Sequence, residues 1–207
     1  MNTHLATLEE LDGACRLRFA RVFPVPPAQL WQAITEPDRL AAWFPQRVEY
    51  LSWDGEPRAG ASIRFSMPGD RGDAFDGEVL ACDPATVLEL RWGTDLLRFE
   101  LDAEDGETLL MLTDTFAEKG KAARDAAGWH VCLDALERAL LGPAAGPDVE
   151  PNVEPNVEPN VEPDVEPAGD LTAAWSRLFP RYVAALGADA ATIGPPDLSA
   201  GDQLSAG

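Results

Sequence analysis

Residues 15–23, CRLRFARVF, show the first clear alternation of hydrophobic and polar positions along the chain. Leu17, Phe19 and Arg21 fall on one face of this stretch, and the residues between them fall on the other. A period of two predicts a β-strand with one buried face. Pro24 is expected to end the strand, because proline lacks the amide hydrogen that a central strand position needs.

The pattern then changes to helical spacing over residues 25–44. In VPPAQLWQAIT, residues 25–35, the two prolines are tolerated only in the first turn of a helix, and Leu30 and Ile34 recur on one face. EPDRLAAWF, residues 36–44, repeats this design and ends before a further proline. Two short helices are therefore predicted directly after the first strand.

From residue 46 the period returns to two, and short strand-like runs recur with Gly, Pro or Asp between them. The runs cover residues 47–53, 61–67, 75–82, 86–92, 96–102 and 108–116. No helix-length segment separates any two of them, so an antiparallel meander is favoured over βαβ units. Together with the first strand, this gives a sheet of about seven strands.

The segment 120–142 has the length and pattern of one long amphipathic helix that can cover the apolar face of this sheet. Its apolar face is expected to hold Trp129, Cys132, Leu133, Leu136 and Leu140, and its polar face Arg124, Asp125, Asp134, Glu137 and Arg138. The sequence thus predicts an α+β domain over residues 14–142, with the sheet curled around the long helix and the short helices at one end.

A tetrapeptide repeat, DVEPNVEPNVEPNVEPDVEP, follows at residues 148–167. Proline at every fourth position excludes a helix, and each residue before proline is biased towards an extended backbone. Residues 143–169 are therefore predicted to be a disordered acidic insert that acts as a spacer. The stretch 170–187 regains helical spacing and is predicted to pack back onto the domain, whereas residues 1–13 and 188–207 are expected to be flexible.

Charge and cysteine content exclude several classes of protein. The net charge is −20, the repeat holds seven acids and no base, and Lys and Arg are not clustered anywhere. Nucleic-acid binding and binding to an anionic membrane are therefore not expected. Three widely spaced cysteines indicate no disulfide framework, and neither a signal peptide nor a membrane span is visible, so we expect a cytoplasmic protein.

His130 is the one residue that invites a catalytic role. Asp134 follows one helical turn later and could orient its imidazole, although a half-buried histidine hydrogen-bonded to a neighbouring strand explains the same pattern. Convergent metal ligands, an activated serine or cysteine, and a phosphate-binding loop are not visible in the sequence. We therefore expect neither a metal nor a cofactor, and no catalytic residue other than this weak candidate.

Three stretches together resemble a known family: residues 20–44, the DGEV motif at 76–79, and GWHVCLDALERAL at 128–140. They are similar to the activator of heat shock protein 90 ATPase homologue family, of the START-like or SRPBCC superfamily. The resemblance implies a helix-grip fold, in which an antiparallel sheet curls around a C-terminal helix with a cavity between them. None of the three stretches is a catalytic signature, so the resemblance bears mainly on the fold.

The resemblance also directs attention to the aromatic residues, since START-like cavities lie between the long helix, the sheet and the short helices. Six tryptophans and eight phenylalanines are available either to fill a core or to line such a cavity. Trp43, Phe65 and Trp129 are the candidate lining residues, with His130 beside them.

Three functions stay open at this point. The first is the binding of a small hydrophobic ligand without chemistry of the protein's own, as the superfamily implies. The second is an interaction module that assists a chaperone, as the family name implies. The eukaryotic members have an additional N-terminal domain that contributes to chaperone binding, and this sequence is expected to have no room for it. The third is a cyclase or dehydratase that uses His130.

Overall fold

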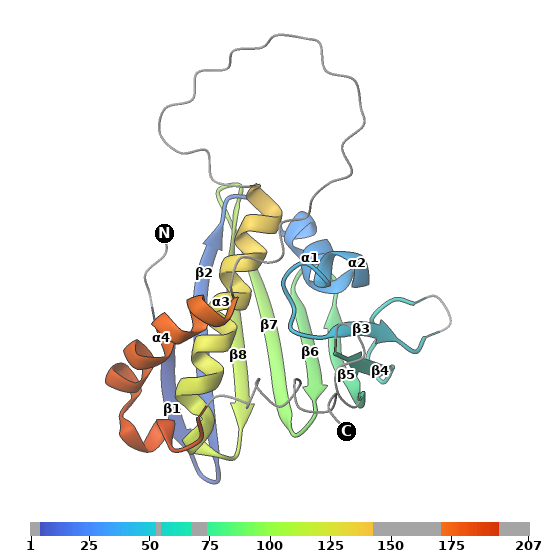
Figure 1. The fold of residues 1–207 in the computed structure, drawn as a ribbon. Helices are drawn as coiled ribbons and strands as arrows, with labels where there is room; N and C mark the ends of the chain where they lie inside the picture. Colours follow the sequence, from blue (N-terminus) through green and yellow to red (C-terminus); the bar gives the residue numbers. More distant parts are fainter. Residues whose placement is uncertain (1–4, 53–54, 68–73, 143–170, 195–207) are drawn as a thin grey trace, which may run out of the picture.

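The computed structural model describes residues 5–52, 55–67, 74–142 and 171–194, and these form one sheet with four α-helices (Figure 1). The strands are β1 (Thr7–Leu11), β2 (Ala14–Phe23), β3 (Arg47–Tyr50), β4 (Ser62–Ser66), β5 (Phe75–Asp83), β6 (Val87–Trp92), β7 (Asp95–Glu104) and β8 (Glu107–Phe116). Every neighbouring pair is antiparallel, in the order β1-β2-β8-β7-β6-β5-β4-β3. The predicted helix-grip class of α+β fold is confirmed, with eight strands in place of about seven.

The extra strand, β1, corrects part of the expectation that residues 1–13 are flexible. Thr7 to Leu11 pair with Arg18 to Ala14 of β2 and form an edge of the sheet. The stretch TLEEL has no strong strand pattern of its own, so the free hydrogen-bonding edge of β2 decides its conformation.

The two short helices begin at prolines, as predicted. The first, α1, spans Pro27–Thr35, and the second, α2, spans Pro37–Leu40. Glu36 between them is extended, which is the conformation favoured before proline. The second helix is shorter than the expected 36–44, and its last residues, up to Phe44, continue as turns.

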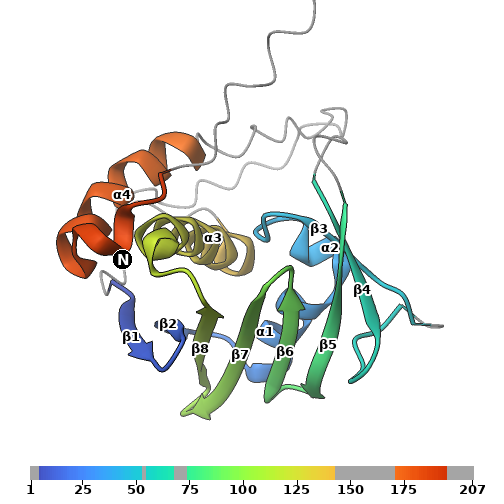
Figure 2. The ribbon, with the colours of Figure 1, turned by 90° about the horizontal axis from the view of Figure 1, so that it is seen from below.

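The long helix α3, Ala122–Leu141, lies in the concave face of the curled sheet, as Figure 2 shows from one end of the molecule. A short 3-10 turn, η2 (Lys119–Lys121), leads from β8 into it. Gly142 follows the helix with a φ of 75°, a conformation that favours glycine, so the helix ends where the predicted segment 120–142 ends.

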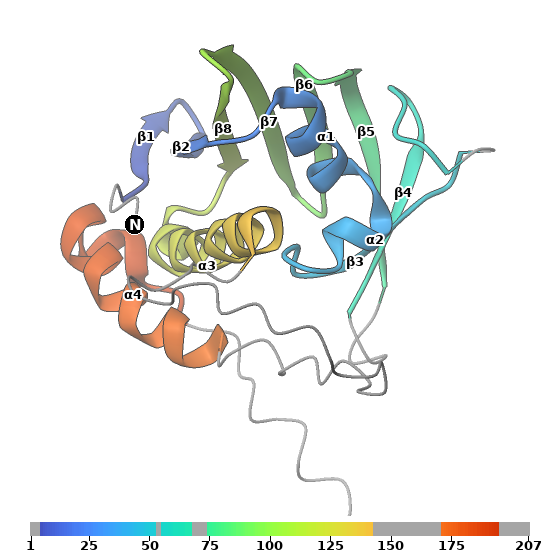
Figure 3. The same ribbon diagram turned by 90° about the horizontal axis from the view of Figure 1, so that it is seen from above.

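A fourth helix, α4 (Leu171–Leu186), packs along α3 and is followed by a 3-10 turn, η3 (Ala188–Ala191) (Figure 3). The tail expected to be flexible from residue 188 is thus ordered at its start. Its remainder and the predicted insert 143–169 lie outside the described residues.

The helix α3 is buried on two sides, because the sheet covers one side and α4 covers another. This corrects the expectation of a single apolar face. His130 is buried, and the Asp125 side chain, expected on the solvent side, is only 11% exposed. None of the helices in the described part of the chain is long and apolar enough to span a membrane.

Candidate functional site

Seven aromatic side chains meet between the concave face of the sheet, the end of α2 and the middle of α3. We call them the aromatic cluster: Trp43, Phe44, Phe65, Phe75, Trp92, Phe99 and Trp129. Each ring lies 5.1–6.2 Å, centroid to centroid, from at least one other. Stacked and edge-to-face contacts in this range are favourable beyond the burial of the rings.

Three of the four residues predicted to line a cavity, Trp43, Phe65 and Trp129, belong to this cluster, and all three are buried. Phe44 joins them, because its ring lies 6.1 Å from that of Phe65 and 5.7 Å from that of Trp129. The fold therefore brings together residues from the turns after α2, from β4 and from α3.

One end of the aromatic cluster reaches the surface. Phe75 and Trp92 are only half-buried, and their rings lie 6.2 Å apart. The indole nitrogen of Trp92 donates a hydrogen bond of 3.1 Å to Gln46, whose amide nitrogen lies 3.7 Å from the sulfur of the exposed Met67. The apolar interior is thus continuous from the core to a partly polar edge.

His130, the fourth predicted residue, lies in a different place, at the junction of α3 and α4. Its Nδ1 is 2.8 Å from the hydroxyl of Tyr182, which also accepts a hydrogen bond from the backbone amide of Ala6. Burial and the nearby Arg21 guanidinium lower the pKa of His130. Its contacts therefore indicate a neutral imidazole that connects α3 to α4 and the N-terminal segment.

The same junction explains why an arginine, Arg21, can lie on the buried face of β2. The guanidinium of Arg21 is buried and lies 2.5 Å from Asp134 and 3.7 Å from Glu137 of α3. Asp134 in turn lies 3.8 Å from Nε2 of His130. The carboxylate predicted to orient the histidine is thus shared with, and held closer by, an arginine.

Next to the aromatic cluster is a group of charged residues that the sequence analysis missed. We call it the acid cluster: Asp95 at the start of β7, Asp114 near the end of β8, and Asp125 in α3. Each offers one oxygen within 4.8 Å of the others. Lys121 forms ion pairs with both Asp95 and Asp125, and Nε of Arg124 lies 2.7 Å from Asp125.

Asp114 is the member of the acid cluster that forms no ion pair among the described residues. Its side chain is 0% exposed, and its Oδ2 accepts a 3.0 Å hydrogen bond from the indole nitrogen of Trp129. Its Oδ1 is buried and has no hydrogen-bond partner in the described part of the chain. Burial, together with the negative charges of Asp95 and Asp125, raises the pKa of Asp114 to about 7.

A signal for Asp114 exists in the sequence. Strand alternation over residues 108–116 places it on the same face as Leu110, Leu112 and Phe116, so an acid falls on a buried face. The same alternation marks Asp95, which directly precedes the predicted run 96–102 and shares a face with Leu97, Phe99 and Leu101. Nothing comparable marks Asp125, because only the packing of α3 brings it close to the two strands.

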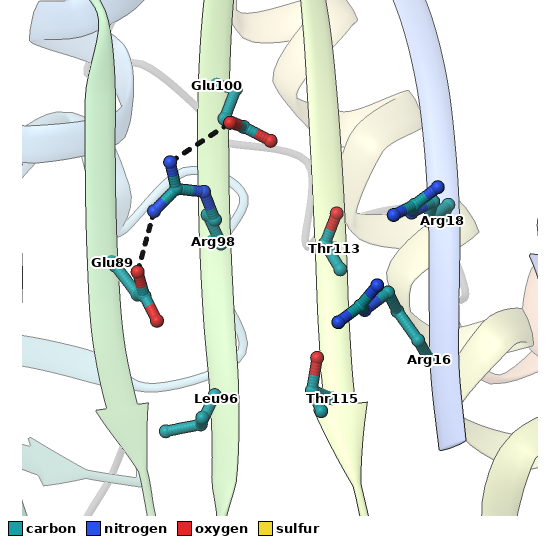
Figure 4. A pocket seen from close by; sticks show the side chains of 8 residues that line it. All are labelled: Arg16, Arg18, Glu89, Leu96, Arg98, Glu100, Thr113 and Thr115. Carbon is teal, nitrogen blue, oxygen red and sulfur yellow. Dashed lines mark hydrogen bonds and ion pairs between the residues drawn. The ribbon is translucent and has the colours of Figure 1, made fainter. Parts of the chain in front are cut away.

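Two hollows open elsewhere on the surface. One, of about 310 Å³, lies on the convex face of the sheet between Arg16 and Arg18 on one side and Arg98 on the other, with Thr113 and Thr115 between them (Figure 4). Arg98 is already paired with Glu89 and Glu100, and Glu9 lies beside Arg16 and Arg18. This hollow is therefore a groove in an ion-paired surface.

The second hollow, of about 470 Å³, lies next to α1 and is lined by Trp31, Cys82 and the chain from Glu56 to Ala59. Burial raises the pKa of the Cys82 thiol, and the same is true of Cys15 and Cys132. Since the thiolate is the reactive form, none of the three cysteines has the environment of a nucleophile.

Comparisons with solved structures show the same fold in other proteins. EF2215 from Enterococcus faecalis, a conserved protein of unknown function, aligns with a TM-score of 0.62 and 19% identity over 87% of this chain and 90% of its own. CalU16 from Micromonospora echinospora aligns with a TM-score of 0.59 and 18% identity over 87% of this chain and 95% of its own.

A third structure, DynU16 of the dynemicin biosynthetic locus, is 27% identical with a TM-score of 0.52, over 61% of this chain and 47% of its own. A comparison with curated proteins finds no match. The sequence model of the family described as Activator of Hsp90 ATPase homolog 1-like protein matches residues 24–141, from the end of β2 to the end of α3. Since this match covers more than half of the chain, the protein belongs to that family of the START-like superfamily.

Proposed function

We propose that the protein binds a small hydrophobic ligand between the sheet and α3, in contact with the aromatic cluster. The observation that carries the proposal is the continuity of the rings, from the buried Trp43 and Phe65 to the half-buried Phe75 and Trp92. Ligand sites are lined mainly by apolar and aromatic side chains with a few polar groups. Trp92 with Gln46, and Trp129 with Asp114, supply such polar groups.

The comparisons support this proposal at a coarser level. A START-like fold is a ligand-binding fold, and a similar structure, DynU16, comes from the dynemicin biosynthetic locus. His130 has no place in the proposed site, because its contacts are with α4 and the N-terminal segment.

A thermal-shift screen with a panel of aromatic and aliphatic compounds tests the binding. A ligand that binds only the folded state at 100 times its Kd stabilises it by about 2.7 kcal/mol. For a domain of this size, that corresponds to a rise in Tm of about 5–10 °C. Absence of a shift with every flat aromatic compound of the panel would count against the proposal.

Indole N–H signals in NMR spectra locate the ligand. The signals of Trp92 and Trp129 are expected to move on binding, because their rings belong to the aromatic cluster, whereas that of Trp175 in α4 is expected to stay. Trp92→Glu should weaken binding of an uncharged ligand. Trp175→Glu is a matched control, since Trp175 is also half-buried with a hydrogen-bonded indole nitrogen.

The family description supports a second candidate, an interaction with a heat-shock chaperone. In that case the protein would accelerate ATP turnover by the chaperone and would be retained by it in a pull-down. A chaperone interaction that does not involve the aromatic cluster should be unchanged in Trp92→Glu. Unchanged ATP turnover on addition of the protein would exclude this candidate.

A further inference from the structure

The acid cluster is unusual because it is buried and because its charges are unequally compensated. Lys121 and Arg124 supply the positive charges that face Asp95 and Asp125. Among the described residues, the carboxylate of Asp114 accepts one hydrogen bond, from the uncharged indole N–H of Trp129, and forms no ion pair. A buried carboxylate with one donor costs free energy unless it is protonated or meets a further partner.

The surroundings of Asp114 leave few candidates for that partner. Its neighbours across the sheet are Leu17 of β2 and Leu97 of β7, and neither side chain can form a hydrogen bond. A divalent cation bound by the three carboxylates would have to displace the ammonium group of Lys121, which already pairs with Asp95 and Asp125. The cluster therefore favours an uncharged hydrogen-bonding ligand over a metal ion.

Trp129 connects Asp114 to the aromatic cluster. One edge of its indole donates to Oδ2 of Asp114, and its ring lies 5.7 Å from that of Phe44 and 5.5 Å from that of Trp92. A second connection runs through the sheet, where Asp95 pairs directly with Trp92. The carboxylate of Asp114 thus lies at the polar boundary of the aromatic interior.

We propose that Asp114 is a ligand-binding residue whose free Oδ1 accepts a hydrogen bond from the hydroxyl group of a flat aromatic ligand of the phenol class. The inference rests on the proposed function, since the ligand must first enter the aromatic cluster and shift the indole of Trp129. Charge-assisted O–H···O⁻ hydrogen bonds are among the strong ones, so this contact would select hydroxylated rings over hydrocarbons of the same shape.

A comparison of 2-naphthol with naphthalene separates the two proposals. Both compounds fill the same space, but only 2-naphthol has a hydroxyl group. With the wild-type protein, we expect 2-naphthol to bind about tenfold more tightly than naphthalene at pH 8, as measured by tryptophan fluorescence titration. Naphthalene binding alone tests the proposed function, and the ratio of the two affinities tests the role of Asp114.

Substitution of Asp114 sharpens the comparison. Asp114→Asn keeps an oxygen for Trp129 and the shape of the side chain, but it removes the charged acceptor. The tenfold ratio should fall to about one in this variant and persist in Asp134→Asn, in which the substituted carboxylate on α3 instead faces Arg21. Circular dichroism confirms that each variant is folded.

The wild-type protein provides a readout that needs no variant. Asp114, facing Asp95 of β7, Asp125 of α3 and Lys121, is half-protonated near pH 7. A phenol donates best to the ionised form, so 2-naphthol should bind more tightly as the pH rises from about 6 to about 8, and naphthalene should not. Equal affinities for the two compounds at every pH would overturn the role of Asp114 but not the proposed function. If neither compound binds, both the role of Asp114 and the proposed function are overturned.

Discussion

The hydroxyl group of Tyr182 joins three segments that are distant in the sequence, and its removal is the sharpest test of how the C-terminal helix is held. Tyr182 is completely buried in α4. Its hydroxyl oxygen lies 2.8 Å from Nδ1 of His130 in α3 and accepts a 3.3 Å hydrogen bond from the amide of Ala6, just before β1. Tyr182→Phe removes this hydroxyl and leaves both partners buried.

The expected effect follows from the two groups that lose their partner. A buried donor or acceptor without a hydrogen bond costs about 1–3 kcal/mol. The buried imidazole of His130 and the buried amide of Ala6 both lose their partner, so we expect a loss of about 2 kcal/mol in the free energy of unfolding. This corresponds to a fall in Tm of about 4–8 °C for a domain of this size.

Tyr50→Phe is a matched control. Tyr50 in β3 is also buried, but its hydroxyl has no hydrogen-bond partner among the described residues. Removal of an unpaired buried hydroxyl should leave the stability unchanged or increase it by up to about 1 kcal/mol. Thermal melts followed by circular dichroism, with urea unfolding of the same proteins, give both values. A Tyr182→Phe protein that melts within about 1 °C of the wild type would refute this account of α4 docking.

Three further predictions concern the sheet, the acid cluster and the insert. Gly77→Ala should destabilise the protein by more than about 2 kcal/mol in urea unfolding, because its methyl group would overlap the backbone carbonyl of Arg91, whereas Gly128→Ala, in open space on α3, should stabilise it by about 0.5–1 kcal/mol. The raised pKa of Asp114 means that the folded state holds a proton more tightly than the unfolded state, so this contribution to stability is present below pH 4 and is lost as the pH rises to about 7. Asp114→Asn should therefore remove a slope of up to about 1.4 kcal/mol per pH unit in this window, and parallel wild-type and variant profiles would contradict it. Deletion of residues 148–167 should preserve both the melting transition and ligand binding, and loss of either would show that the repeat is more than a spacer.

The strands and helices of the main domain could be predicted because their signals are local. Alternation in β2 and β8 follows from which side chains face α3, and prolines at 27 and 37 mark the starts of α1 and α2. The strand β1 could not be predicted, because TLEEL becomes a strand only beside β2.

The candidate site could be predicted only in part. Large aromatic side chains indicate an apolar interior, so the sequence could identify Trp43, Phe65 and Trp129 as candidate residues of that interior. Alternation indicates that Asp114 is buried, but its proximity to these rings depends on strand register and on the packing of α3. The surroundings of His130 depend on which of two partners, the sheet or α4, covers that side of α3. Sequence spacing places a residue on a face of a helix, but it does not say what packs against that face.

Because α3 and α4 contact each other directly, the chain should tolerate an insertion or a cut in the connection between them. The two helices pack against each other, and Tyr182 fixes their relative position, so the connection from 143 to 170 has only to close a loop. The entropy of loop closure rises slowly, by about 0.6 kcal/mol for each doubling of length. This connection is therefore a natural place to insert a guest domain, or to cut the chain into two fragments that reassemble, with α4 as the smaller fragment.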